Sequence, residues 1–237
     1  MLRTITFLSI FCLLTSCSNG ENKSIMISNN DTSATTNEYT YLALGDSYTI
    51  AQSVPSTESY PAQTVNILSA ENVHFSAPEI IARTGWTTTD LLNKINSSPP
   101  QRSSYDIVTL LIGVNNQYQH LSEEQYKTEF TALLNKAIQY TNANKKRVIV
   151  LSIPDYSVTS FSQGSDTAYI TQQIDLFNRI NRTISLQAGV NYLDITAYTR
   201  MAANDHSLIA YDGLHPSGKE YRIWAKDLAA LIKTILK

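Results

Sequence analysis

The feature that most constrains the fold of this chain is an alternation of short apolar segments with helical patterns, from residue 39 to residue 237. Nearly continuous apolar strands are typical of a parallel sheet that is covered on both faces. Strands that alternate with helices predict an α/β sandwich, in which right-handed crossovers join the parallel strands. The strands are expected over 41–44, 80–82 (with a start as early as Val73), 107–112, 148–153 and, with a weaker pattern, 190–195.

Four stretches carry apolar residues at helical spacing, and three of them begin with a capping signal. Residues Ser122 to Gln125 and Thr87 to Asp90 match the capping box, in which the first side chain accepts a backbone N–H and the last reaches back to the cap residue. Ser217 is expected to cap the last helix. The helices are expected over about 87–95, 122–138, 170–184 and 217–235.

Residues 1–17 have the pattern of an export signal. Arg3 is followed by a mostly apolar run over residues 5–14, which is shorter than the roughly 20 residues that span a bilayer. The run ends in Leu-Thr-Ser before Cys17, which resembles the lipobox of bacterial lipoproteins. This resemblance implies cleavage before Cys17, lipidation of its thiol and a membrane anchor, and Ser18 then favours the outer membrane if the cell has two membranes. The alternative is a plain secretory peptide with an incidental cysteine.

Residues 18–38 are polar and contain few large apolar side chains. Such a segment cannot bury enough surface to offset the entropy lost on ordering, so we predict a flexible tether with a reach of about 25 Å. No internal repeat and no second linker follows it. Residues 39–237 are therefore predicted to form one domain.

The charge and the cysteine content exclude several classes of function. The formal net charge is −2, so no broad basic surface for nucleic acid is expected. The two cysteines, Cys12 and Cys17, leave none in the remaining chain for a disulfide, a cysteine metal site or a cysteine nucleophile. No metal-ligand spacing such as His-Glu-x-x-His occurs, so neither a metal nor another cofactor is predicted. The oligomeric state is left open by the sequence.

Polar side chains collect in four loops, each of which follows a predicted strand. Ligands bind beyond the carboxyl ends of the strands of an open parallel sheet, so we expect these loops to meet at one edge. Together they bring a hydroxyl, a glycine amide, a carboxamide, an imidazole and a carboxylate, which are the groups that acyl transfer requires. The loops are 45–47, 83–86, 113–116 and, further along the chain after the fifth strand, 212–216.

These loops resemble the sequence blocks of the SGNH hydrolase family, also called the GDSL family, and the resemblance covers nearly the whole chain from residue 39. It implies a three-layer α/β/α sandwich of the flavodoxin-like type, with about five parallel strands. The blocks are a Gly-Asp-Ser opening, a glycine, a Gly-x-Asn-Asp and an Asp-x-x-His, found here at Ser47, Gly85, Asn115 and the pair Asp212 and His215.

The expected chemistry is that of a serine esterase. Ser47 is a weak nucleophile until a base removes its proton, and the imidazole of His215 is suited to this role near neutral pH. Asp212 is expected to hold that imidazole in the useful tautomer. The backbone N–H groups of Ser47 and Gly85 and the side-chain amide of Asn115 would form the oxyanion hole. An acyl-serine intermediate would follow and be hydrolysed by water.

Other residues near the predicted site have two interpretations each. The candidates for substrate contacts are Asp46, Trp86, Asn116 and Asp155. A turn, a cap or packing would explain each of them as well. Asn116 also departs from the family pattern, which usually has aspartate there, and this affects fine positioning more than catalysis. Tyr48, Tyr118 and Tyr156 would either stack on a sugar or pack at the rim, and packing is favoured in a chain with 14 tyrosines.

Three functions fit these observations. The first is an esterase for small acyl esters, such as acetyl groups on extracellular polysaccharide, because glycans are what an exported and anchored protein meets. The second is a lysophospholipase or thioesterase, which would need a long apolar channel for an acyl chain. The third is a glycan-binding surface protein that has the fold but no turnover. We rank them in this order.

Overall fold

The computed structural model describes residues 38–237. The predicted export signal, Cys17 and the predicted tether up to residue 37 lie outside the described residues. Five strands form one parallel sheet in the order β2-β1-β3-β4-β5, so the predicted five-stranded parallel sheet is confirmed. The strands are β1 (Tyr41–Asp46), β2 (Glu79–Arg83), β3 (Ile107–Leu111), β4 (Val148–Leu151) and β5 (Asn191–Leu193).

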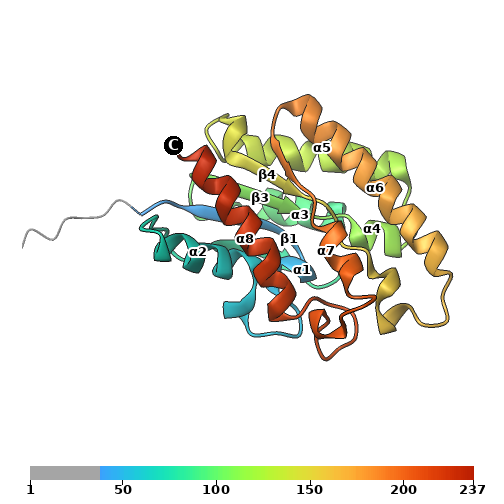
Figure 1. Cartoon of the computed structure of the whole chain (residues 1–237). Helices are drawn as coiled ribbons and strands as arrows, with labels where there is room; N and C mark the ends of the chain where they lie inside the picture. The colour runs from blue at the N-terminus through green and yellow to red at the C-terminus, as the bar shows by residue number, and fades with distance from the viewer. Residues whose placement is uncertain (1–37) are drawn as a thin grey trace, which may run out of the picture. The chain divides into compact units, whose positions relative to one another are not determined.

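Helices cover both faces of the sheet and complete a three-layer α/β/α sandwich (Figure 1). On one face lie α2 (Tyr60–Ala70) and α8 (Gly218–Ile235), which pack against each other, and on the other lie α3 (Thr88–Ser97), α5 (Glu123–Gln139) and α6 (Thr167–Ala188). Shorter elements are α1 (Ser47–Ile50), α4 (Val114–Tyr118), α7 (Thr196–Met201) and the 3-10 turns η1 (Ser56–Glu58), η2 (Lys145–Arg147), η3 (Tyr156–Val158), η4 (Ser160–Ser162) and η5 (His206–Leu208). Within residues 38–237, no helix is both long and apolar enough to cross a membrane.

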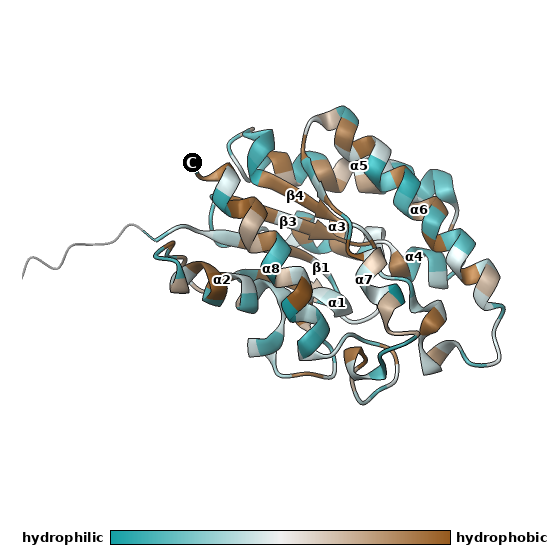
Figure 2. Cartoon of the chain, viewed as in Figure 1, coloured by the Kyte–Doolittle hydropathy of each residue, from teal (hydrophilic) through white to brown (hydrophobic). Residues whose placement is uncertain are grey.

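The core lies between the sheet and its two helical layers. Every residue of β1, β3 and β4 is buried, as the continuous apolar runs predict. In Figure 2 the central strands β3 and β4 are brown, whereas the helices carry both teal and brown segments. Burial of apolar surface against both faces is therefore the main source of stability for the central strands.

The capping signals are confirmed in part. At the start of α3, the Asp90 carboxylate accepts the Thr87 backbone N–H at 2.9 Å and the Thr87 hydroxyl accepts the Asp90 N–H at 3.4 Å, which is the full capping box. At the start of α5, the Ser122 hydroxyl accepts the Gln125 N–H at 3.2 Å. The prediction that the Gln125 side chain bonds back to the cap residue Ser122 is wrong. Its amide donates instead to the Thr89 hydroxyl of α3 at 3.1 Å.

The register of the sheet places three of the four predicted loops together. Gly45 of β1 lies between Ala82 of β2 and Leu111 of β3, one residue before β1 ends. The chain therefore leaves all three strands at the same edge of the sheet. This edge carries the candidate site.

Candidate active site

Ser47 is the first residue of α1, directly after β1. The Asp46 side chain caps this helix by accepting the Tyr48 backbone N–H at 3.0 Å. Gly45 has to lack a side chain, because a Cβ there would lie 2.0 Å from the Thr49 hydroxyl oxygen and 2.5 Å from the Leu111 carbonyl oxygen. The Gly-Asp-Ser sequence thus forms a tight turn from strand to helix and places Ser47 in the first turn of α1. The backbone N–H of a first-turn residue has no carbonyl partner within the helix.

Asp46 itself is fully buried and does not border the cavity that Ser47 faces. Its Oδ2 atom has no hydrogen-bond partner among the described residues. Burial raises the pKa of Asp46 to about 7, and the backbone hydrogen bond from Tyr48 opposes this only in part. The structure therefore places Asp46 as the cap of the turn, and a contact with substrate stays a prediction.

His215 and Asp212 form a close pair in the loop before α8. His215 Nδ1 lies 2.6 Å from Asp212 Oδ2, and Asp212 Oδ1 accepts the backbone N–H groups of Leu214 and His215, each at 3.0 Å. The Ser53 hydroxyl also donates to Asp212 Oδ2, at 2.6 Å. Burial acts to raise the pKa of Asp212, but the hydrogen bonds from Ser53 and His215 outweigh it and lower this pKa to about 2.

The loop that carries His215 is held at both ends by backbone hydrogen bonds. The Ala210 N–H donates to the His215 carbonyl at 2.7 Å, and the Ser217 N–H donates to the Leu208 carbonyl at 2.7 Å. Ser217 caps α8 as predicted, since its hydroxyl accepts the Glu220 N–H. The imidazole is therefore fixed by the fold and not only by its carboxylate partner.

Gly85 and Asn115 come from the loops after β2 and β3. Gly85 has a φ of +80°, and the Trp86 N–H donates to the Arg83 carbonyl at 3.2 Å, so the segment is a tight turn that favours glycine. The Asn115 side-chain amide donates to the Trp86 carbonyl at 3.0 Å, which joins the two loops. A carboxamide has two N–H groups, so the second N–H of Asn115 can donate to a ligand.

Ser47, Gly85, Asn115 and His215 border one cavity of about 120 Å³. Four of the groups that the sequence predicts for acyl transfer are thus brought together, with Asp212 bonded directly behind His215. The remaining lining is largely apolar and aromatic: Tyr48, Thr84, Val114, Tyr118, Tyr156, Phe161 and Leu214. Among residues 38–237, no group of three or more histidine, cysteine or acidic side chains is placed to hold a metal ion.

Comparison with known proteins shows the family of this chain. The model of the GDSL-like lipase/acylhydrolase family matches residues 43–223. The chain belongs to this family. None of the curated proteins that were compared matches it.

Several solved structures share the fold of this GDSL-family chain. TesA aligns with a TM-score of 0.65 at 17% identity, covering 83% of this chain and 99% of its own. A variant of Axe2, an acetyl-xylooligosaccharide esterase from Geobacillus, gives 0.63 at 20% identity, covering 82% and 94%. The esterase EstA from Pseudoalteromonas gives 0.62 at 20% identity, covering 84% and 99%. As a member of this family, the protein is a hydrolase that acts on ester bonds.

Two further predicted contact residues of this acylhydrolase lie outside the cavity lining. Asn116 is fully buried, where its carbonyl accepts the Thr88 N–H at 3.0 Å and its amide donates to the Thr88 hydroxyl at 2.6 Å. Trp86 is half-buried against the core and offers its backbone carbonyl to Asn115. Asn116 therefore ties the loop after β3 to the start of α3, and substrate contacts by either residue stay predictions.

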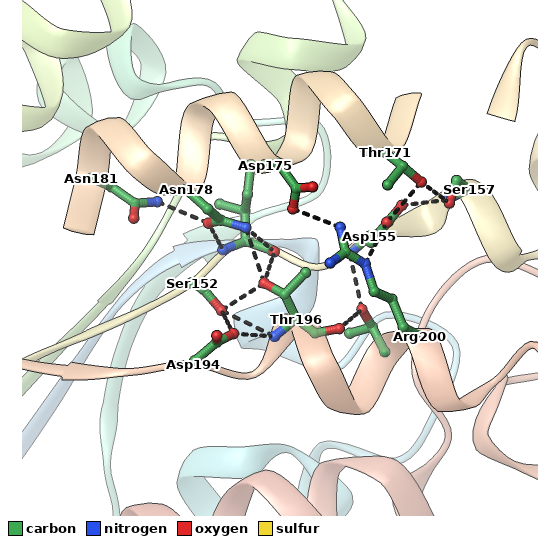
Figure 3. A network of polar contacts seen from close by, with 12 residues as sticks. Ser152, Asp155, Ser157, Thr171, Asp175, Asn178, Asn181, Asp194, Thr196 and Arg200 are labelled. Carbon is green, nitrogen blue, oxygen red and sulfur yellow. Dashed lines mark hydrogen bonds and ion pairs between the residues drawn. The ribbon is translucent and has the colours of Figure 1, made fainter. Parts of the chain in front are cut away.

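Asp155 belongs to a network of polar contacts that joins α6, α7 and η3 (Figure 3). Its carboxylate accepts from the Arg200 guanidinium at 2.9 Å, from the Thr171 hydroxyl at 3.0 Å and from the Ser157 N–H at 2.9 Å. These partners belong to α7, α6 and η3, so the buried carboxylate holds three segments together. It does not border the catalytic cavity.

Two residues near the site have no counterpart in the sequence predictions. Ser53 bonds Asp212 although 159 positions separate them along the chain, and no motif marks it. Glu220 is 2% exposed, and its Oε1 atom has no hydrogen-bond partner among the described residues. The only sequence signal for Glu220 is its place three residues after Ser217, where a carboxylate usually returns to the helix cap.

Proposed function

We propose that this protein is a serine esterase that hydrolyses carboxylic esters through an acyl-serine intermediate on Ser47. The observation that carries the proposal is the 2.6 Å contact between His215 and Asp212 in a loop that brings the imidazole to the same cavity as Ser47. The family match supports the same class of reaction.

Asp212 orients the base in the proposed mechanism. Because its carboxylate accepts the proton on His215 Nδ1, Nε2 is left to take the proton of the Ser47 hydroxyl. Ser47 Oγ then bonds to the ester carbonyl carbon, and the electron pair of the C=O bond moves to oxygen. When this pair returns, the bond to the alcohol breaks and the alcohol leaves with the proton from His215. Water then attacks the acyl-serine in the same way and releases the acid.

In the proposed mechanism, three N–H donors stabilise the tetrahedral oxyanion. They are the first-turn N–H of Ser47, the N–H of Gly85 in its tight turn and the second amide N–H of Asn115. All three residues border the cavity. Donors that are fixed before the reaction stabilise developing charge at little reorganisation cost, and this is often the largest single catalytic effect.

The substrate in this proposal has a small acyl group, with an acetyl group on a carbohydrate hydroxyl as the main candidate. The cavity, at about 120 Å³, is well below the roughly 300–1,000 Å³ of pockets that enclose drug-sized ligands. Structural relatives include acetylxylan esterases, although the identity is only 17–20%. The second candidate is a lysophospholipase or thioesterase. Its support is the apolar lining by Val114, Phe161 and Leu214.

Chain-length preference tests the proposal. We expect turnover of p-nitrophenyl acetate to exceed that of butyrate and of octanoate, with loss of turnover for all three in Ser47→Ala. Equal melting temperatures would show that Ser47→Ala is folded. A preference for octanoate would select the lipid-directed alternative. If the unmodified protein shows no turnover and Ser47→Ala still binds glycan, the non-catalytic alternative is selected.

We further propose that the protein is exported and anchored to the cell envelope by a lipid on Cys17. Support comes from the apolar run over residues 5–14 that ends in Leu-Thr-Ser before this cysteine. The outer membrane is the expected location in a cell with two membranes. The esterase would then act on substrates outside the cytoplasm.

A further inference from the structure

A second hollow, of about 520 Å³, lies beside the loop that carries Asp212 and His215. The chain segments 160–162 and 213–214 form a wall that borders both this hollow and the catalytic cavity. In this wall the Phe161 N–H donates to the Gly213 carbonyl at 3.0 Å, and the Ser160 hydroxyl donates to the same oxygen at 3.2 Å. Phe161 borders the catalytic cavity, whereas Ser160 and Gly213 border the second hollow, so the two hollows lie on either side of the same wall.

The second hollow is lined by both polar and apolar side chains; none of them is acidic, and His206 is the only basic residue among them. Hydroxyl and amide side chains predominate, including Thr159, Ser160, Gln163 and Thr167. A hollow for phosphate or for an acidic polymer would need several cations, and a channel for an acyl chain would not need the hydroxyl and amide groups found here. Hydroxyl and amide groups beside apolar and aromatic surface match a neutral ligand that has both hydroxyl groups and apolar faces.

Exposed aromatic rings gather around the two hollows. In residues 38–237 the exposed aromatic side chains are Tyr118, Phe161, Tyr169 and Tyr211. Tyr118 and Phe161 border the catalytic cavity, and Tyr211 borders the second hollow. Tyr211 is the most exposed of the four, with 89% of its surface accessible. Large aromatic surfaces that remain open to water commonly mark a binding surface.

The backbone on both sides of Tyr211 is fixed. The Ala210 N–H donates to the His215 carbonyl at 2.7 Å, and the Gly213 N–H donates to the Ala210 carbonyl at 3.0 Å. Gly213 has a φ of +72°, and a Cβ there would lie 2.3 Å from the Ser160 hydroxyl oxygen, so the loop lies tightly against the wall. The Tyr211 ring is thus presented from a rigid loop, and binding a ligand costs little additional ordering.

We propose that the second hollow is a subsite for neutral sugar units of an oligosaccharide whose esterified unit lies at Ser47, with the Tyr211 ring as a stacking platform. The apolar face of a sugar ring packs on an aromatic ring, while its hydroxyl groups bond to the hydroxyl and amide side chains of the lining. This inference rests on the proposed esterase function and adds to it the substrate class, a carbohydrate chain longer than one unit.

The test compares Tyr211→Ala with Tyr169→Ala, because Tyr169 is also an exposed tyrosine but borders neither hollow. The substrates are acetylated xylo-, manno- and gluco-oligosaccharides and p-nitrophenyl acetate. We expect Tyr211→Ala to raise the KM for the preferred oligosaccharide. The factor of increase should be at least about five times the factor for p-nitrophenyl acetate. Tyr211→Phe should retain most of the preference, and Tyr169→Ala should match the unmodified protein.

A binding measurement separates failure of the subsite from failure of the esterase. Ser47→Ala is titrated calorimetrically with the deacetylated oligosaccharides, with and without Tyr211→Ala. Binding that weakens on loss of Tyr211 supports the subsite even if no ester is hydrolysed. Turnover of p-nitrophenyl acetate combined with no oligosaccharide binding, or with equal binding in both proteins, overturns the subsite and leaves the esterase intact.

Discussion

Asn115 links two of the loops at the candidate site, since it borders the cavity and bonds to the Trp86 carbonyl. If its second amide N–H bonds to the oxyanion, the contact is stronger in the transition state than with bound substrate. We predict that Asn115→Ala lowers kcat by about 10²–10³ and changes KM little. Steady-state kinetics on p-nitrophenyl acetate measures this.

The matched control for that prediction is Asn116→Ala, because the neighbouring asparagine is buried and bonds to Thr88. It should lower the melting temperature more than Asn115→Ala does. A normal kcat in Asn115→Ala would remove this side chain from the oxyanion hole.

The sequence could not show that Asn116, unlike Asn115, is buried away from the cavity. Successive residues on a helix point about 100° apart, so one of two neighbours faces the cavity and the other the core. Ser53 could not be found for a different reason, because its contact with Asp212 depends on the tertiary fold alone. Ser47, Gly85, Asn115 and His215 were predictable, because each lies just after a strand or in a recognisable motif.

At the level of elements, the strands and four helices follow from apolar patterns, whereas α2 was missed. Its buried residues include Tyr60, Thr64 and Leu68, four positions apart, and the polar Thr64 interrupts the apolar stripe. The hydroxyl of Thr64 donates to the Tyr60 carbonyl at 2.7 Å, which allows a polar residue in the core. Ser59 and Pro61, at the start of the helix, were signals that could have found it.

Glu220 in the first turn of α8 makes the stability of this element depend on pH. Burial raises the pKa of this carboxyl from the ordinary 4.5 to about 8, although Trp224 acts to lower it. The folded state therefore keeps a proton that the unfolded state releases, so the free energy of unfolding falls as the pH rises from about 4.5 to about 8.

We predict that Glu220→Gln removes this loss, because glutamine does not ionise. From about pH 4.5 to about pH 8, the free energy of unfolding of Glu220→Gln should rise relative to that of the unmodified protein. The rise should be about 1.4 kcal/mol for each unit by which the pKa of Glu220 differs between the folded and the unfolded state. Urea unfolding from pH 4.5 to pH 9 measures the difference. Glu124→Gln, at an exposed position of α5, serves as the control. Parallel stability curves for Glu220→Gln and the unmodified protein would contradict the assignment.

At the scale of the whole molecule, the esterase domain and its proposed anchor are separate in the sequence. The family match covers residues 43–223, whereas Cys17 precedes it and lies outside the described residues. We predict that Cys17→Ala shifts the protein from the membrane fraction to the soluble fraction without changing esterase activity per molecule. Cys12→Ala should remain with the membrane. A membrane-bound Cys17→Ala protein would overturn the lipid anchor.

The proposed mechanism requires Ser47 to be the nucleophile, and covalent labelling identifies the nucleophile without a substrate. An activated phosphonate ester reacts with a serine that a neighbouring histidine activates, because the serine oxygen displaces the leaving group from phosphorus. We predict one phosphonyl group per molecule, located by peptide mass spectrometry on Ser47, with loss of esterase activity in proportion to labelling and no labelling of Ser47→Ala. Labelling on another residue, or esterase activity that survives in folded Ser47→Ala, would contradict the account.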